Sequence, residues 1–338
     1  MGFQRARMYS HTVLAAVLVI TLMMQGTSAS ASATVRTSMV STIWTEPASG
    51  YGFILEAINH ARTSVELSMY ELSDTAIEHA LIDRAQSGVS VKVILNADYE
   101  GKSENEAAFD ALRAGSVHVV WAPDNQIFHA KYMVVDDDTA YIGTGNFVPH
   151  DYSSTRDFWV ADTQPSDVSA ITATFKSDFN GAETTNQASG GLVWSPGSTN
   201  ALVDLISHAR QSLLIENEEM DSSPVEKALI AAAHRGVDVS IVMTKDAEWT
   251  VALGQLAASG VHVRLLGASQ IYIHAKVICA DCTPDAGTVF IGSENFSTSS
   301  LDYNRELGII TSTRGAVQAV RTTVDGDYAI GASPAPRK

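Results

Sequence analysis

One short pattern occurs twice in this chain and limits its fold more than any other feature. The pattern is His-x-Lys-x4-Asp, which begins at His129 and again at His274, and each copy leads into Gly-[Thr/Ser]-x-Asn. A single copy of so loose a spacing is weak evidence for any chemistry. Two copies in matching surroundings indicate that each belongs to one copy of a repeated unit.

The repeat covers most of the chain. Matching segments recur after about 145 residues, beginning with Trp44 and Trp194 and ending with Asp178 and Asp327. The sequence therefore predicts a tandem duplication whose halves are joined by a polar, Gly/Ser/Thr-rich linker. The expected parts are the first half at 40–180, the linker at 181–191, the second half at 192–330 and a flexible Pro/Ala-rich tail at 331–338.

Helical and strand patterns alternate within each half. In the first half, the spacing of apolar residues predicts helices at 53–62 and 74–87 and strands at 64–69 and 89–95. The second half repeats them, with helices at 200–210 and 223–235 and strands at 212–215 and 237–243. Such alternation favours parallel strand pairing and an α/β sandwich in each half.

Each His-x-Lys motif lies in a short, apolar, β-branched run that predicts a buried strand. Successive side chains on a strand point to opposite faces, so the histidine and lysine of each motif would share one face. These pairs are His129 with Lys131 and His274 with Lys276. The aspartates that end the motifs fall on the opposite parity and are interpreted as structural residues: Asp136 and Asp281.

The first residues have the pattern of a targeting segment. Arg5 and Arg7 precede an apolar run at 13–24, and small residues at 26–33 contain two Ala-x-Ala sequences. This order predicts a secretory signal peptide at 1–33, because the apolar run is short for a membrane span. An uncleaved anchor is the alternative. We expect a secreted protein, extracellular or periplasmic after cleavage.

Charge and cysteine content limit the partners. The chain has 22 basic and 38 acidic residues, a net charge of −16, and affinity for nucleic-acid backbones comes largely from Lys and Arg. We expect no stable nucleic-acid partner and a monomer. Cys279 and Cys282 form a C-x-x-C that is compatible with a disulfide or with free thiols, and a zinc site would need two further ligands.

The two motifs, with their following Gly143-Thr144-x-Asn146 and Gly292-Ser293-x-Asn295, resemble those of the phospholipase D superfamily. The resemblance implies two motifs facing each other across a pseudo-two-fold axis, with one active site between the halves and neither metal nor cofactor. It implies a catalytic set made of His129, His274, Lys131, Lys276, Asn146, Asn295, Asp157 and Glu306.

Simple chemistry agrees with this resemblance. Two lysines and two amides can hold a phosphoryl group, and two imidazoles can supply a nucleophile and an acid. The resemblance implies a phosphohistidine on His129 and acid/base work by His274, with the reverse assignment left open. It also implies that Asp157 and Glu306 orient the imidazoles. Thr144 and Ser293 are expected to offer hydroxyl donors to the phosphoryl group.

The substrate is less constrained than the reaction. We expect a phospholipase D-type phosphodiesterase that hydrolyses the headgroup phosphodiester of phospholipids and contacts membrane surfaces transiently, and transfer to alcohols is left open. The alternative is a secreted, metal-independent nuclease of the same superfamily, whereas complete motifs disfavour a silent binding protein. Tyr70-Glu71 and Glu218-Glu219, which end the first strand of each half, lie either at the pocket mouth or in solvent.

Overall fold

The computed structural model describes residues 37–38, 40–99, 101–182, 186–187 and 189–334. The predicted signal peptide lies outside the described residues, as do parts of the predicted linker and tail. Among the helices in these ranges, none is both long and apolar enough to cross a bilayer.

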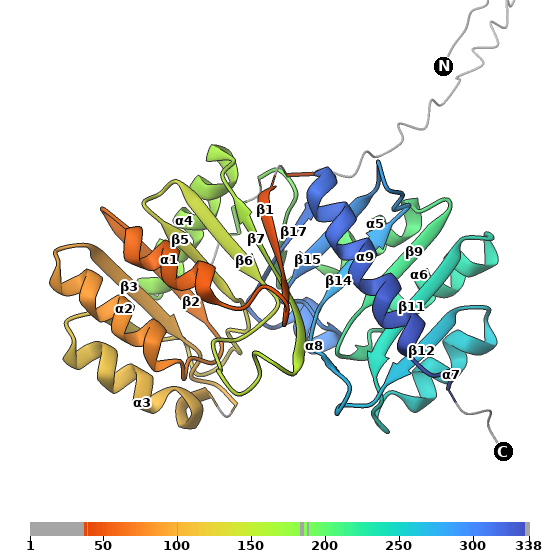
Figure 1. The fold of residues 1–338 in the computed structure, drawn as a ribbon, viewed down its shortest axis with the longest axis horizontal. Coiled ribbons are helices and arrows are strands. Elements are labelled where there is room, and N and C mark those ends of the chain that lie inside the picture. The colour runs from red at the N-terminus through yellow and green to blue at the C-terminus, as the bar shows by residue number, and fades with distance from the viewer. Residues whose placement is uncertain (1–36, 39, 100, 183–185, 188, 335–338) are drawn as a thin grey trace, which may run out of the picture. The chain divides into compact units, whose positions relative to one another are not determined.

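The first half is a mixed sheet with helices on both faces (Figure 1). Its elements are β1 (Val40–Glu46), α1 (Gly52–His60), β2 (Ser64–Met69), α2 (Thr75–Gln86), β3 (Ser90–Leu95), α3 (Gly101–Ala114), β4 (His118–Trp121), β5 (Tyr132–Val135), β6 (Thr139–Gly143), β7 (Thr155–Asp162) and α4 (Pro165–Phe179). The strand order is β1-β7-β6-β5-β2-β3-β4.

The second half repeats this plan. Its elements are β8 (Leu192–Ser195), α5 (Thr199–His208), β9 (Ser212–Glu216), β10 (Met220–Asp221), α6 (Ser223–His234), β11 (Asp238–Thr244), α7 (Thr250–Ala258), β12 (His262–Leu266), β13 (Tyr272–Ile273), β14 (Val277–Ala280), β15 (Thr288–Gly292), β16 (Phe296–Ser297), α8 (Thr298–Asp302), β17 (Glu306–Thr311) and α9 (Arg314–Ile330). The main sheet runs β12-β11-β9-β14-β15-β17-β8, so the α/β duplication predicted from the repeat is confirmed.

The prediction of parallel pairing is correct for only part of each sheet. Strands β2, β3 and β4 are parallel, as are β9, β11 and β12, because a helix connects each strand to the next. The pairs β5–β6, β6–β7, β14–β15 and β15–β17 are antiparallel, and short turns or loops without a long crossover helix join their strands. At the tight turn between β5 and β6, Asp136 and Asp137 adopt φ values of 57° and 53°, a left-handed conformation that Asp tolerates better than most residues.

Local sequence signals explain where the helices begin. The Asp74 carboxylate caps α2 by accepting hydrogen bonds from the backbone N–H groups of Ala76 and Ile77. A proline stands in the first turn of α4 and of α6, where its missing N–H leaves no helical hydrogen bond unmade.

The apolar core has three parts. One joins α1, α2 and α3 to the first sheet, and a second joins α5, α6 and α7 to the second sheet. The third contains residues of both halves, with Phe158 and Val160 of β7 in the same cluster as Leu307 and Ile309 of β17. Figure 1 shows β6 and β7 beside β15 and β17, with α9 crossing the second sheet. Burial of this shared cluster stabilises the association of the halves.

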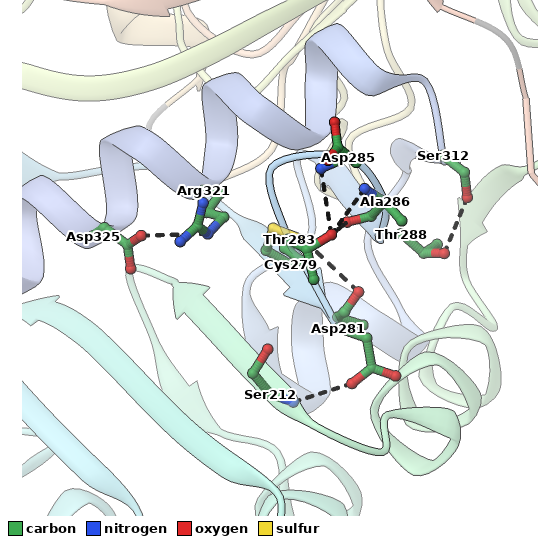
Figure 2. The surroundings of a disulfide bond; sticks show 12 residues. Ser212, Cys279, Asp281, Thr283, Asp285, Ala286, Thr288, Ser312, Arg321 and Asp325 are labelled. Carbon is green, nitrogen blue, oxygen red and sulfur yellow. Dashed lines mark hydrogen bonds and ion pairs between the residues drawn. A yellow bond between two sulfur atoms is a disulfide. The ribbon is translucent and has the colours of Figure 1, made fainter.

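The C-x-x-C sequence forms a disulfide. Cys279 at the end of β14 is bonded to Cys282 in the loop that leads to β15, and this loop is longer than the corresponding turn in the first half (Figure 2). Within the same loop, Thr283 Oγ1 accepts from the backbone N–H of Ala286. Close to the disulfide, the Asp281 carboxylate accepts a hydrogen bond from the backbone N–H of Ser212.

The start of the predicted flexible tail is attached to the second sheet. Ala332 exchanges both backbone hydrogen bonds with Leu265 of β12, at 2.8 and 2.9 Å. The expectation of an unstructured tail from Gly331 onward is therefore wrong for its first residues. The Pro/Ala-rich composition did not reveal that an edge strand offers free backbone partners at this point.

Candidate active site

Two backbone pairings bring the histidine motifs to the boundary between the halves. Strand β13 pairs in parallel with β7 of the first half, with Ile273 opposite Arg156. In the other direction, the backbone N–H groups of His129 and Ala130 both donate to the carbonyl of Arg305, at 2.9 Å. Each motif therefore begins beside the segment of the other half that carries the acid of the repeat, Asp157 or Glu306.

These pairings change one sequence prediction. The run containing His129 and Lys131 was expected to be a strand, but β5 begins only at Tyr132, and β14 likewise begins after Lys276. In the segment before β5, the backbone N–H groups of His129 and Ala130 donate to the opposite half and not to a strand of their own sheet. The period of apolar residues cannot distinguish these two uses of an extended backbone.

Each histidine is bonded to the acid of the other half. His129 Nδ1 lies 2.9 Å from Glu306 Oε2, and His274 Nδ1 lies 2.8 Å from Asp157 Oδ1. A carboxylate only accepts, so each Nδ1 carries the proton and donates it. This leaves Nε2 of both imidazoles directed to other partners, as in other sites where a carboxylate orients a histidine.

Two hydroxyls expected to face the phosphoryl group lie elsewhere. Thr144 is fully buried, donates to Asp157 Oδ1 at 2.5 Å and accepts from the backbone N–H of Phe158. Ser293 is also fully buried and accepts from the backbone N–H of Leu307. The prediction of phosphate-binding hydroxyls is therefore wrong, because both side chains act behind the site, where Thr144 supports an orienting acid.

Arginines next to the orienting acids form ion pairs between the halves. Arg156 of β7 binds Asp327 of α9, with Nε 2.6 Å from Oδ2. Arg305 binds Asp178 of α4 in the same way, at 2.8 Å, and is 1% exposed. Both pairs obey the repeat, and each connects the strand end carrying an orienting acid to a helix of the opposite half. Buried pairs of this kind are costly to break on one side only.

The two lysines are buried behind the histidines. Lys131 and Lys276 are 0% exposed, and each Nζ donates to the carbonyl of the histidine two residues earlier. Lys131 lies over the ring of Tyr70, with Nζ 4.9 Å from its centroid. Burial, and then the neighbouring charge of Lys276, lower the pKa of Lys131 to about 7.

The two amides of the motifs contact glutamates that were not assigned to the site from the sequence. Asn146 Nδ2 donates to Glu71 Oε2 at 3.3 Å, and Asn295 Nδ2 donates to Glu219 Oε1 at 3.0 Å. Asn295 also lies 3.4 Å from Glu218 Oε2. These acids were left open between the pocket mouth and solvent, and the structure places all three in the pocket. Their place just after a buried strand, which the structure shows to be β2 or β9, was the signal in the sequence.

One cavity of about 480 Å³ connects both histidines. Its lining includes catalytic candidates from each half, namely His129, Asn146, Asp157, His274 and Asn295. Glu306 is fully buried behind His129 and does not line the cavity. Sequence reasoning did not identify Tyr272, which lines the same cavity and donates its hydroxyl to Glu218 Oε1 at 2.8 Å.

The electrostatic surroundings of the two histidines differ. Burial lowers the pKa of His129 to about 4, a shift that Glu306 opposes and Lys131 reinforces. His274 lies between two carboxylates, because Glu218 Oε2 is 3.7 Å from its Nε2 while Asp157 holds its Nδ1. Although burial acts against ionisation, His274 holds the pKa of Asp157 below its usual range. The duplication thus produces a site that is not symmetric in charge.

The motif aspartates lie outside the cavity and bind backbone. Asp136 accepts from the N–H groups of residues 62–64 at 2.7–3.1 Å, and Asp281 accepts in the same way from residues 210–212. Each aspartate thus joins the end of one strand to the start of its neighbour. In the part of the chain that the structure describes, no three His, Cys, Asp or Glu side chains are arranged to hold a metal ion.

Comparison with known proteins matches both halves. The family model described as "Cardiolipin synthase, PLD-like domain" matches residues 54–179 and 202–328. A phospholipase D of Rickettsia bellii is 32% identical over 110 residues, which are 32% of this chain and 54% of that protein. The chain thus spans about half the length of this curated relative.

Two solved structures share the fold. Phosphatidylserine synthase of Haemophilus influenzae has a TM-score of 0.68 at 11% identity and covers 88% of this chain and 89% of its own. Polyphosphate kinase of Porphyromonas gingivalis has a TM-score of 0.66 at 16% identity, over 85% of this chain and 50% of its own. At such identities these likenesses concern the fold alone. Because the family model matches each half around its histidine motif, the chain belongs to the phospholipase D superfamily.

Proposed function

We propose that this protein hydrolyses the headgroup phosphodiester of phospholipids through a phosphohistidine intermediate. The observation that carries the proposal is the pair of histidines from opposite halves in one cavity, each with Nδ1 bonded to a carboxylate. Both Nε2 atoms are then available to the two sides of a phosphorus centre, one to attack and the other to protonate.

His129 is assigned as the nucleophile. Its low pKa, about 4, keeps the imidazole neutral at pH 7, and a neutral Nε2 has the free electron pair needed for attack. Nε2 forms a bond to phosphorus while the bond from phosphorus to the headgroup oxygen breaks. Glu306 accepts the Nδ1 hydrogen bond and stabilises the positive charge that develops on the ring.

His274 is assigned as the acid and base. A carboxylate lies beside each of its nitrogens, so both N–H groups of an imidazolium have an anionic neighbour. In the first step its Nε2 gives a proton to the departing oxygen. In the second step it takes a proton from a water that attacks phosphorus and breaks the bond to His129.

The phosphoryl oxygens receive positive charge and N–H groups from two lysines and two asparagines: Lys131, Lys276, Asn146 and Asn295. Fixed donors of this kind are effective because they need no rearrangement as charge moves in the transition state. The acidic lining of the cavity, with Glu71, Asp151, Glu218 and Glu219, disfavours a polyanionic strand and supports a phospholipid over a nucleic acid. We also propose that the N-terminal segment, residues 1–33, directs export of the protein.

The test compares two substrates under one set of conditions. The purified protein is given choline phospholipid vesicles and single-stranded DNA in parallel, with excess chelator. Release of the headgroup without DNA cleavage is expected. DNA cleavage with a steep salt dependence and no headgroup release would favour the nuclease alternative. Loss of all activity in chelator, restored by a divalent metal, would contradict the mechanism.

A further inference from the structure

The carboxylate of Glu218 lies in the cavity at the place where the substrate phosphate is expected. Glu218 Oε2 lies 3.0 Å from Lys276 Nζ, 3.4 Å from Asn295 Nδ2 and 3.7 Å from His274 Nε2. These three groups are the phosphate donors and the acid that the second half supplies. We propose that Glu218 is a specificity-determining residue whose carboxylate occupies the phosphate subsite of the free protein and must be displaced by the substrate.

The carboxylate is held in place and keeps its charge. The Tyr272 hydroxyl donates to the other oxygen, Oε1, at 2.8 Å, and the side chain of Glu218 is 22% exposed. Although burial acts against ionisation, Lys276 and then His274 hold the pKa of Glu218 below its usual range. The carboxylate is therefore ionised at neutral pH.

The first half lacks this arrangement. The residue that corresponds to Glu218 in the repeat is Tyr70, whose ring faces Lys131 as a cation–π partner and carries no charge. Among the ion pairs of the described residues, Lys131 takes part in none, whereas Lys276 is paired with Glu218. Among the described residues, an ion pair between a motif lysine and a carboxylate is thus found in the second half only.

Displacement of Glu218 has a consequence for substrate choice. A phosphodiester that reaches Lys276 exchanges one anion for another there, and the released carboxylate stays in a cavity that also holds Glu219 and Glu71. Each further negative charge on the substrate then meets an uncompensated carboxylate at short range, where Coulomb repulsion is strong. The residue therefore selects for phosphodiesters with a single negative charge and against phosphomonoesters and polyanions.

Inorganic phosphate tests this inference without relying on catalysis. Its dissociation constant is measured by titration calorimetry at one pH for the wild type, Glu218→Gln and Glu71→Gln. An amide in place of the Glu218 carboxylate keeps the size of the side chain and removes its charge, so phosphate should bind at least about tenfold more tightly. Glu71→Gln removes a carboxylate from the same cavity without breaking a lysine ion pair, so it should tighten binding less than about threefold.

A second variant guards against misfolding of the first. Tyr272→Phe removes the hydrogen bond that holds Glu218 and should give an intermediate tightening of phosphate binding. Circular dichroism and the melting temperature report whether each variant is folded. Unchanged or weaker phosphate binding in folded Glu218→Gln would overturn the inference. Equal tightening in Glu218→Gln and Glu71→Gln would also overturn it, because that result would show a general effect of cavity charge.

A further test, which measures turnover of substrates, rests on the proposed function. Glu218→Gln should raise kcat/KM for a phosphomonoester or an oligonucleotide relative to that for choline phospholipid, and an unchanged ratio would contradict selection by charge. Failure of the proposed function is distinguishable, because it would appear as no headgroup release by the wild type. The phosphate titrations would still decide whether Glu218 occupies the subsite.

Discussion

His274 Nδ1 lies 2.8 Å from Asp157 Oδ1, although the two residues are 117 positions apart and belong to different halves. Glu306 and His129, separated by 177 positions, form the reciprocal pair at 2.9 Å. Each half therefore contributes the histidine of one pair and the acid of the other. Neither half holds a histidine with its own orienting carboxylate, so the four residues act as one unit.

The first prediction concerns the two histidines. His129→Ala or His274→Ala should lower turnover by at least about 10²-fold, and the double variant should be scarcely worse than the worse single one. His274→Ala should spare a phosphodiester with a p-nitrophenol leaving group, which needs little protonation, whereas His129→Ala should not. Mass spectrometry of quenched His274→Ala should locate a phosphoryl group on His129. An adduct on His274 in the wild type would reverse the assignment.

Each histidine is bonded to the acid of the other half, and this exchange of acids between the halves leads to a second prediction. Asp157→Asn should behave as a defect of the acid and spare the p-nitrophenyl substrate, because Asp157 serves His274. Glu306→Gln should behave as a defect of the nucleophile and impair both substrates, because Glu306 serves His129. Each loss should be about 10²-fold or more in steady-state kcat. The opposite pattern, in which each acid variant behaves like the histidine variant of its own half, would contradict the exchange of acids between the halves. Asp136→Asn is the control, since that side chain binds backbone outside the cavity.

The pH profile should show two limbs. Below about pH 4, His129 gains a proton and loses its free electron pair, so kcat/KM should fall. Above about pH 7, Lys131 loses its proton and the phosphoryl group loses one cation, so kcat/KM should fall again. The limb near pH 7 should move to higher pH in kcat, because bound phosphate favours charged Lys131. Lys131→Arg should remove this limb if the variant folds, and persistence of the limb in that variant would assign it to another group.

The disulfide should matter for stability and little for turnover. Replacing Cys279 and Cys282 by Ser should preserve most of the activity and lower the melting temperature by a few degrees, because the closed loop is short. Thermal denaturation and kinetics of the double variant check this expectation. A loss of about 10³-fold in kcat/KM, in a variant that remains folded, would instead give the cysteines a role in the reaction.

The repeat predicted the fold well because it reports two copies of the same buried pattern. It also predicted which residues meet, including His129, His274 and both asparagines in one cavity. It could not predict that each histidine is bonded to the acid of the other half. Asp157 and Glu306 follow their asparagines at the same spacing, so pairing within a half and pairing between halves satisfy the same sequence.

The wrong assignments of Thr144 and Ser293 have a common physical origin. Thr144 and Ser293 were assigned to phosphate because they stand beside motif residues, but a hydroxyl of a fully buried residue satisfies the nearest buried donor or acceptor. Glu218 was left open between the pocket mouth and solvent for a different reason. A charged residue after a strand usually lies in solvent, and only the tertiary structure brings Lys276 to its carboxylate.

The pairings of Arg305 with Asp178 and of Arg156 with Asp327 join residues that are far apart in the order of translation. When the first half emerges from the ribosome, His129, Lys131 and Asn146 are present, but the carboxylate that orients His129 has not been translated. Glu306 and Asp327 follow only near the end of the described chain. A growing chain therefore contains a complete histidine motif before the acid that orients its histidine exists, and the contacts that complete the candidate site can form only late in synthesis.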